Sequence, residues 1–164
     1  MRSRCKMILF IFMLSILTEP LLSNINFNII SFSIYPSILS IIILYPYLKL
    51  YKLIIYSLII GITYTFLYTH SLIYIPIFIL ICLITYFIFK NSKYNIINII
   101  LTSMFIIFIY NTLTYFIYLL FYNLNISYTY LFGKLIFLYI FNAIYLILIY
   151  IFINIIPFKK IRQE

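Results

Sequence analysis

The side chains that could carry chemistry are few and scattered. The chain holds one histidine, two carboxylates and two cysteines, which are His70, Glu19, Glu164, Cys5 and Cys82. A catalytic site needs an acid, a base or a nucleophile at one place, and a metal site needs several ligands at short spacings. None of these residues has such a companion nearby in the sequence. The sequence therefore predicts neither an enzyme nor a site for a cofactor or metal.

The composition is that of a membrane protein. Hydrophobic residues make up 67% of the chain, charged residues 8%, and the mean hydropathy is +1.22. A soluble domain covers its surface with polar groups, and 11 basic and 2 acidic side chains are too few for that. The apolar runs are apolar at odd and even positions alike, which favours helices over alternating barrel strands. We expect an all-α integral membrane protein.

The lengths of the charge-poor runs predict how many helices cross the membrane. A helix needs about 20 residues to cross the hydrocarbon core. The runs predict a bundle of six transmembrane helices in a single domain, with spans at about 7–22, 29–48, 53–67, 72–89, 98–120 and 135–156.

The basic residues predict the orientation of these spans. Ten of the eleven lie before the first span, in alternate connections or after the last span, and Lys134 is the exception. The ten are Arg2, Arg4, Lys6, Lys49, Lys52, Lys90, Lys93, Lys159, Lys160 and Arg162. Because cytoplasmic loops are enriched in Lys and Arg, both termini are expected in the cytoplasm. The basic residues form no compact face with interleaved aromatics, so we expect no nucleic-acid partner.

Two segments have alternative interpretations. Residues 1–22 resemble a signal peptide in having a basic start and a short apolar run, but no small-x-small cleavage site follows, so we expect them to be retained. Asn125, Ile126 and Ser127 form a glycosylation sequon, which we interpret as a chance match.

Glu19 is the one carboxylate inside the apolar region. It lies beside Pro20 at the expected outer end of the first span. A charge costs about 2.5–3.5 kcal/mol at the bilayer centre and less at the interface, so we expect Glu19 at the interface. Its role there is either solvation by water or a helix-end contact, within the bundle or to a partner.

Polar and small residues at helical spacing mark candidate contact faces. Ser57, Gly61 and Thr65 recur every four residues, which lets another helix approach closely. Asn111 begins a polar stripe on the fifth span, and Asn142 lies within the sixth. The stripe continues through Thr114, Tyr115, Tyr118 and Tyr122. We expect these residues to pack or hydrogen-bond within the bundle; a partner face or a binding groove is the alternative.

Four stretches together resemble the rod shape-determining protein MreD family over nearly the whole chain. "TEPLLSN" resembles the acid-containing end of that family's first helix, and "YPSILSIIILYPYL" its proline-led second helix. "IYSLIIGITYTFLYTHSL" resembles its helix of spaced small residues, and "FNAIYLILIYIFINIIPFKK" its last helix and basic tail.

The chain also departs from the family pattern. The family favours Gly, Gly and Asp at the positions of Ser57, Gly61 and Thr65, and often Gly at the position of Ile73. It commonly has Glu at the position of Asn111. The ordered set of segments, rather than any single motif, carries the resemblance.

The resemblance implies a non-enzymatic scaffold of the bacterial elongation complex in the inner membrane. Such a protein works with MreC, the MreB filament, the polymerase RodA and a class B penicillin-binding transpeptidase in lateral peptidoglycan synthesis and cell shape. Its basic cytoplasmic turns, here with Lys49, Lys52, Lys90 and Lys93, are expected to favour anionic lipid.

Two other functions stay open. One is the substrate-binding membrane subunit of an energy-coupling-factor vitamin transporter, also a six-helix protein of similar size, for which the tyrosine-rich outer loops and His70 would serve. The chain lacks the alanine-containing coupling motif of those subunits. The other is a small structural subunit of a larger membrane complex.

Overall fold

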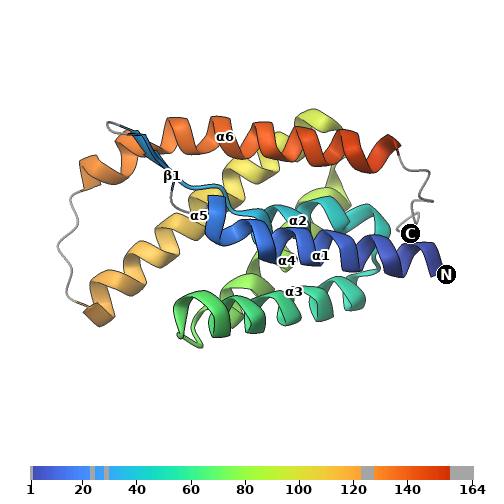
Figure 1. The fold of residues 1–164 in the computed structure, drawn as a ribbon, viewed down its shortest axis with the longest axis horizontal. Helices are drawn as coiled ribbons and strands as arrows, with labels where there is room; N and C mark the ends of the chain where they lie inside the picture. The colour runs from blue at the N-terminus through green and yellow to red at the C-terminus, as the bar shows by residue number, and fades with distance from the viewer. Residues whose placement is uncertain (1, 23–24, 28–29, 123–127, 156–164) are drawn as a thin grey trace.

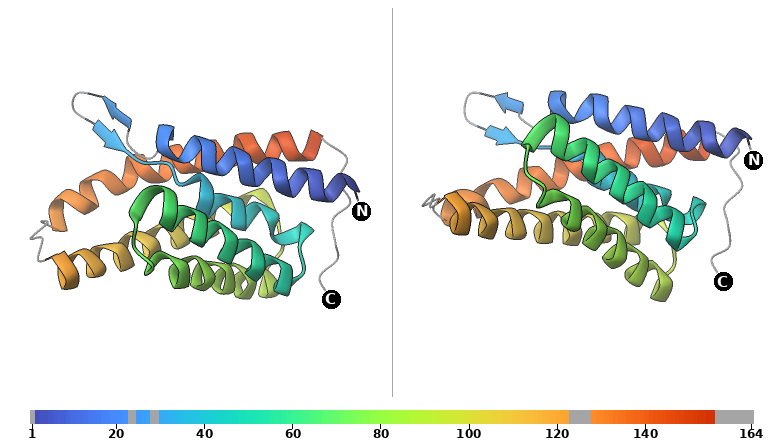
Figure 2. Two further views of the ribbon diagram at one scale, coloured as in Figure 1. Left: turned by 60° about the horizontal axis from the view of Figure 1, so that its bottom comes forward. Right: turned by 90° about the horizontal axis from the view of Figure 1, so that it is seen from below.

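The chain folds into a bundle of helices that run back and forth along one direction (Figures 1 and 2). The computed structural model describes residues 2–22, 25–27, 30–122 and 128–155, with side chains in 6–22, 33–117, 119–120 and 136–153. Its helices are α1 (Arg2–Leu22), α2 (Pro36–Leu44), α3 (Leu50–Tyr64), α4 (Tyr74–Asn91), α5 (Ile96–Tyr122) and α6 (Tyr128–Ile155). The helical class predicted from the composition is confirmed.

Four of the described helical segments are long and apolar enough to cross a membrane. They are Leu50–Thr69, Tyr74–Asn91, Ile96–Ile117 and Ile136–Ile153. These segments correspond to the third, fourth, fifth and sixth predicted spans. The first of them joins α3 to a π-helical turn, η2 (Thr65–Thr69), which ends at His70 with a left-handed φ of 52°.

The prediction of one helix over 29–48 is wrong. Ile30–Phe32 forms strand β2, which pairs antiparallel with β1 (Ile25–Phe27) in a short hairpin. Helix α2 begins only at Pro36. The residue before a proline avoids the helical region, whereas proline itself fits the first helical position. The predicted ends at Ile29 and Ile156 lie outside the described residues.

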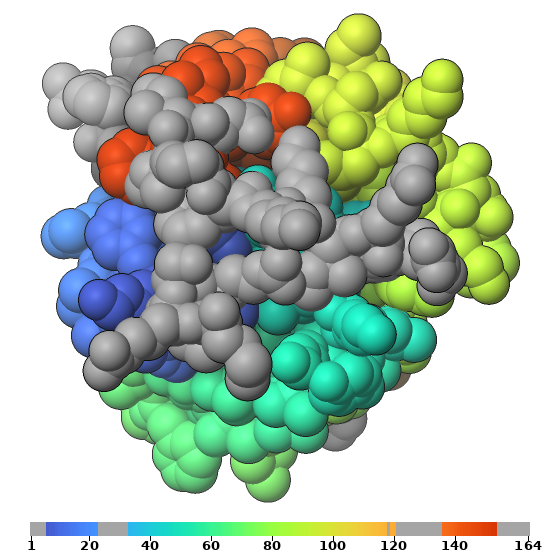
Figure 3. Space-filling view, turned by 90° about the vertical axis from the view of Figure 1, so that its right-hand side faces the viewer, coloured from blue at the N-terminus to red at the C-terminus, as the bar shows by residue number. Residues whose placement is uncertain are grey.

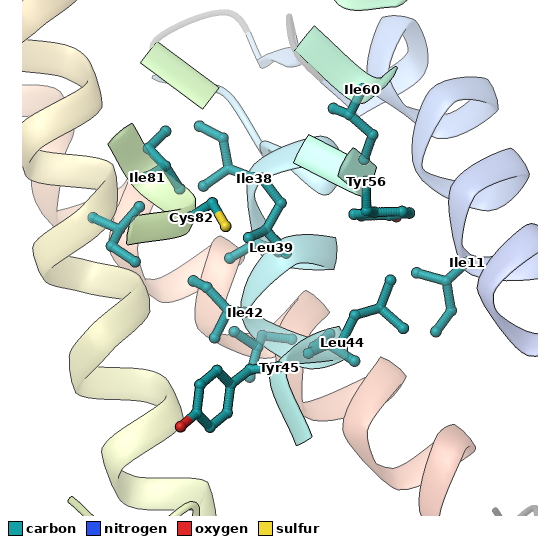
Figure 4. Close-up of a cluster of buried hydrophobic side chains, with 14 of the residues drawn as sticks. Ile11, Ile38, Leu39, Ile42, Leu44, Tyr45, Tyr56, Ile60, Ile81 and Cys82 are labelled. Carbon is teal, nitrogen blue, oxygen red and sulfur yellow. The ribbon is translucent and has the colours of Figure 1, made fainter. Parts of the chain in front are cut away.

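Helix α2 is short and forms the centre of the bundle. It continues into a single 3-10 turn, η1 (Tyr45–Tyr47), which contains Pro46, and every residue from Pro36 to Tyr47 is buried. Figure 4 shows α2 side chains meeting residues of α1, α3 and α4. The labelled members of this cluster are Ile11, Ile38, Leu39, Ile42, Leu44, Tyr45, Tyr56, Ile60, Ile81 and Cys82. Burial on all sides explains why α2 has no polar face.

Helices α3 and α4 approach closely at Gly61. A Cβ at this position would lie 3.2 Å from the Ile75 Cα and 3.3 Å from the Phe78 Cβ. Ser57 and Thr65, which share this face, are buried as well. The small residues of α3 and η2 therefore lie at the contact between α3 and α4.

Candidate functional site

The site begins at the non-helical residues 33–35, which join β2 to α2. Helix α2 and η1 together are about 20 Å long, shorter than a hydrocarbon core of about 30 Å. Three extended residues add up to about 10 Å. Residues 33–47 can therefore cross the membrane only with non-helical backbone inside it. Such backbone is tolerated when its polar groups bond to the protein.

Asn142 of α6 supplies two of these bonds. Its Oδ1 accepts a hydrogen bond from the Tyr35 N–H at 2.9 Å, and its Nδ2 donates to the Ser33 carbonyl at 2.8 Å. The same Nδ2 also donates to the Leu138 carbonyl at 2.7 Å. A donor on one side and two carbonyls on the other fix the orientation of the amide. Asn142 thus holds the main chain of the non-helical residues that precede α2.

Glu19 of α1 binds the start of α2. Its Oε2 accepts a hydrogen bond from the Ser37 N–H at 2.8 Å, and the side chain is only 2% exposed. The first N–H groups of a helix have no partner within the helix, and a carboxylate there also interacts well with the helix dipole. Solvation of Glu19 at the interface is therefore wrong for this fold: the acid makes a contact inside the bundle.

Pro20 leaves a second backbone group, a carbonyl of α1, without its usual helical hydrogen bond. A proline inside a helix cannot donate to the carbonyl four residues earlier, which here is that of Ile16. The Tyr68 hydroxyl donates to this carbonyl from η2. Nearby, the Thr18 and Tyr145 hydroxyls lie 3.2 Å apart and join α1 to α6. The end of α1 is therefore held from two neighbouring elements.

Asn111 of α5 completes the site. Its Oδ1 accepts a hydrogen bond from the Tyr35 hydroxyl at 3.1 Å, and the Tyr35 ring packs on Tyr110 with centroids 5.1 Å apart. The Tyr110 and Tyr64 hydroxyls lie 3.2 Å apart. We call the set Glu19, Ser33, Tyr35, Ser37, Asn111 and Asn142 the polar junction.

The polar junction lies within the apolar part of the bundle. Asn111 lies inside the apolar segment Ile96–Ile117 and Asn142 inside Ile136–Ile153. Glu19 and Asn142 are both buried inside the bundle.

Three buried polar atoms around the junction have no hydrogen-bond partner among the described residues. They are Glu19 Oε1, Ser37 Oγ and Asn111 Nδ2. The Ser37 side chain also lies close to the Glu19 carboxyl group, although its Oγ forms no hydrogen bond of normal geometry. The junction therefore combines backbone groups that are bonded to side chains with side-chain donors and acceptors that have no partner among the described residues.

The other residues singled out in the sequence lie elsewhere. Thr65 donates to the Ser71 carbonyl at 3.2 Å, and Ser57 faces Cys82 across the α3–α4 contact. His70 is exposed. Within the described part of the chain, no group of three or more His, Cys, Asp or Glu residues could hold a metal ion.

Sequence reasoning found three members of the junction and missed three. Glu19, Asn111 and Asn142 were singled out separately, but their common neighbours Ser33, Tyr35 and Ser37 were read as part of a continuous helix. The Tyr35–Pro36 dipeptide was the available signal, because it favours a helix start at the proline.

Comparison with known proteins identifies no relative of this chain. No family model, no curated protein and no solved structure matches the chain.

Proposed function

We propose that this chain is a non-enzymatic scaffold of the bacterial elongation complex in the inner membrane, similar to MreD. One observation carries the proposal. Glu19 belongs to "TEPLLSN" and Ser37 to "YPSILSIIILYPYL", two segments on which the resemblance rests, and a hydrogen bond of 2.8 Å joins them. The acid that the family resemblance led us to expect at the end of the first helix thus has a structural use, which is to seat α2.

The proposed partners are those of that complex: MreC, MreB, RodA and a class B penicillin-binding transpeptidase. The polar junction supports a scaffold because it joins α1, α5 and α6 to the residues around the start of α2, which limits their relative movement. A rigid bundle presents fixed helix faces and turns on both sides of the membrane, and binding then costs less ordering of the chain.

Depletion of the protein in its rod-shaped host is the test of this proposal. We expect the cells to become round and swell, and a plasmid copy of the wild-type gene to restore rods. Cells that keep their shape after depletion would overturn the proposal.

We also propose that α1 and residues 33–47 cross the membrane with the four long apolar segments, and that both termini are cytoplasmic. The connections α2–α3 and α4–α5 carry Lys49, Lys52, Lys90 and Lys93, and loops rich in lysine stay in the cytoplasm. A reporter fused after Ser71 is expected outside and one fused after Lys93 inside. The reverse pattern would refute this orientation.

A second function is favoured by one feature of the junction. Helix α2 begins inside the bundle, and the buried Glu19 Oε1 beside it has no partner among the described residues. Transporters place such broken helices at substrate sites. This geometry favours, as the second candidate, a substrate-binding subunit of an energy-coupling-factor vitamin transporter. Lost vitamin uptake with unchanged cell shape after depletion would select this function over the scaffold.

A further inference from the structure

The exposed charge of the bundle gathers at one end. Among the described side chains, the cationic ones are Lys6, Lys49, Lys52, Lys90 and Lys93, and all five are exposed. Figure 3 looks onto this end, where the α2–α3 turn (teal) and the α4–α5 turn (yellow-green) both reach the surface. The one described carboxylate, Glu19, is bonded to Ser37 at the start of α2, away from this end. Within the described part of the chain, no acidic side chain therefore neutralises the charge of these lysines.

The α4–α5 turn, with Lys90 in the last turn of α4 and Lys93 just after that helix, is fixed to the end of α2. The Tyr94 hydroxyl donates to the Ile43 carbonyl at 3.2 Å. The Tyr45 ring lies 5.1 Å from Phe89 and 6.2 Å from Tyr94, centroid to centroid. Burial raises the pKa of Tyr94 well above its usual value, so its hydroxyl stays protonated and can keep donating.

The α2–α3 turn is fixed to the same helix. Its backbone leaves α2 through η1 and enters α3 at Lys49, whose carbonyl accepts hydrogen bonds from the N–H groups of Lys52 and Leu53 at 2.9 and 3.0 Å. The Lys52 ammonium lies 5.7 Å from the centroid of the exposed Tyr51 ring. Two separate turns thus hold four lysines on one frame built from the end of α2.

We propose that these four lysines form one binding surface for anionic phospholipid headgroups. A lysine near a membrane surface attracts anionic lipid with about 1 kcal/mol, and its long apolar stem lets the ammonium reach the headgroups. Because the frame is already ordered, lipid binding needs to order only side chains. The surface does not depend on the function proposed above.

The test compares spin-labelled phosphatidylglycerol with spin-labelled phosphatidylcholine in vesicles that contain the full-length protein. We expect the wild-type protein to immobilise phosphatidylglycerol preferentially, and the preference to fall with added salt. Each lysine-to-glutamine change is expected to weaken the association with phosphatidylglycerol about fivefold, which corresponds to about 1 kcal/mol. Equal association of the two lipids with the wild-type protein would overturn the proposal.

Three variants distinguish lipid binding at this surface from an effect of the protein's net charge. Lys49→Gln with Lys52→Gln and Lys90→Gln with Lys93→Gln each remove one half, and each is expected to lose most of the preference if the halves act together. Lys6→Gln removes a charge from α1, outside the frame, and is expected to weaken the association less than any single change among the four lysines. A Lys6→Gln effect as large as that of either pair would overturn the proposal, because net charge would then explain the preference.

Tyr94→Phe tests the frame without changing any charge. It removes only the hydroxyl that donates to the Ile43 carbonyl. We expect the preference for phosphatidylglycerol to fall while the circular dichroism of the helices stays that of the wild-type protein. An unchanged preference would show that the two turns bind lipid independently and would overturn the single-surface proposal.

Discussion

Replacing Asn142 by leucine is expected to lower the free energy of unfolding by about 2 to 6 kcal/mol. Leucine has a similar size but offers no donor or acceptor, so the Tyr35 N–H and the Ser33 carbonyl lose their bonds to the side chain. Leaving a buried polar group without a partner costs about 1 to 3 kcal/mol. Both hydrogen bonds are part-buried, so partial access of water places the loss toward the lower end of this range.

Titration of the purified protein with a denaturing detergent, followed by circular dichroism, measures this loss. Asn91→Leu is the matched control, because Asn91 is exposed and its amide donates only to the Phe87 carbonyl of its own helix, at 3.3 Å. Surface changes of this kind are usually within about 0.5 kcal/mol. If Asn142→Leu were as stable as Asn91→Leu, the non-helical residues that precede α2 would not depend on Asn142.

Glu19 is expected to tolerate glutamine and not leucine. Glutamine keeps a side-chain oxygen that can accept from the Ser37 N–H, so the free energy of unfolding should stay within about 1 kcal/mol of the wild-type value. Leucine leaves that N–H without a partner at the start of α2, and we expect a loss of about 1 to 3 kcal/mol. The stability should therefore follow the order glutamine above leucine, regardless of charge.

The same detergent titration applies to both Glu19 variants, together with an assay of the fraction inserted in the membrane. Both variants are expected to insert, because the apolar run of α1 is unchanged. Equal stability of the glutamine and leucine variants would contradict the role of the Ser37 hydrogen bond. If Glu19→Gln folds normally yet fails to restore rod shape in depleted cells, Glu19 also has a role beyond seating α2.

The second span shows where reasoning from the sequence stopped. Hydropathy averages over about 20 residues, so it reports that a segment is apolar without reporting the path of its backbone. Pro36 and Pro46 stood inside the expected span, and each marks a change of backbone: α2 begins at one, and the 3-10 turn contains the other. A proline can also kink a helix that continues. The Tyr35–Pro36 dipeptide alone therefore did not decide between a kinked helix and a helix that begins at Pro36.

Glu19 shows a different limit. Its place in the sequence, beside Pro20 near the end of an apolar run, is compatible with the interface. Its burial depends on Ser37, which lies 18 residues further along, and the contacts of Asn142 with Ser33 and Tyr35 bridge more than 100 residues. Hydrogen bonds between such distant residues leave no periodic pattern in one sequence.

The sequence by itself determined that this protein is a helical membrane protein, where its four long apolar helices lie, and that Lys49, Lys52, Lys90 and Lys93 fall near alternate connections. Those properties follow from local composition, because burial in lipid depends on the apolar character of each segment in turn. The tertiary structure alone decided that the apolar segment over 29–48 is not one helix and that Glu19, Asn111 and Asn142 contact the residues around the start of α2. Non-helical backbone within a membrane must bond to the protein, and only the packed bundle brings those partners to it.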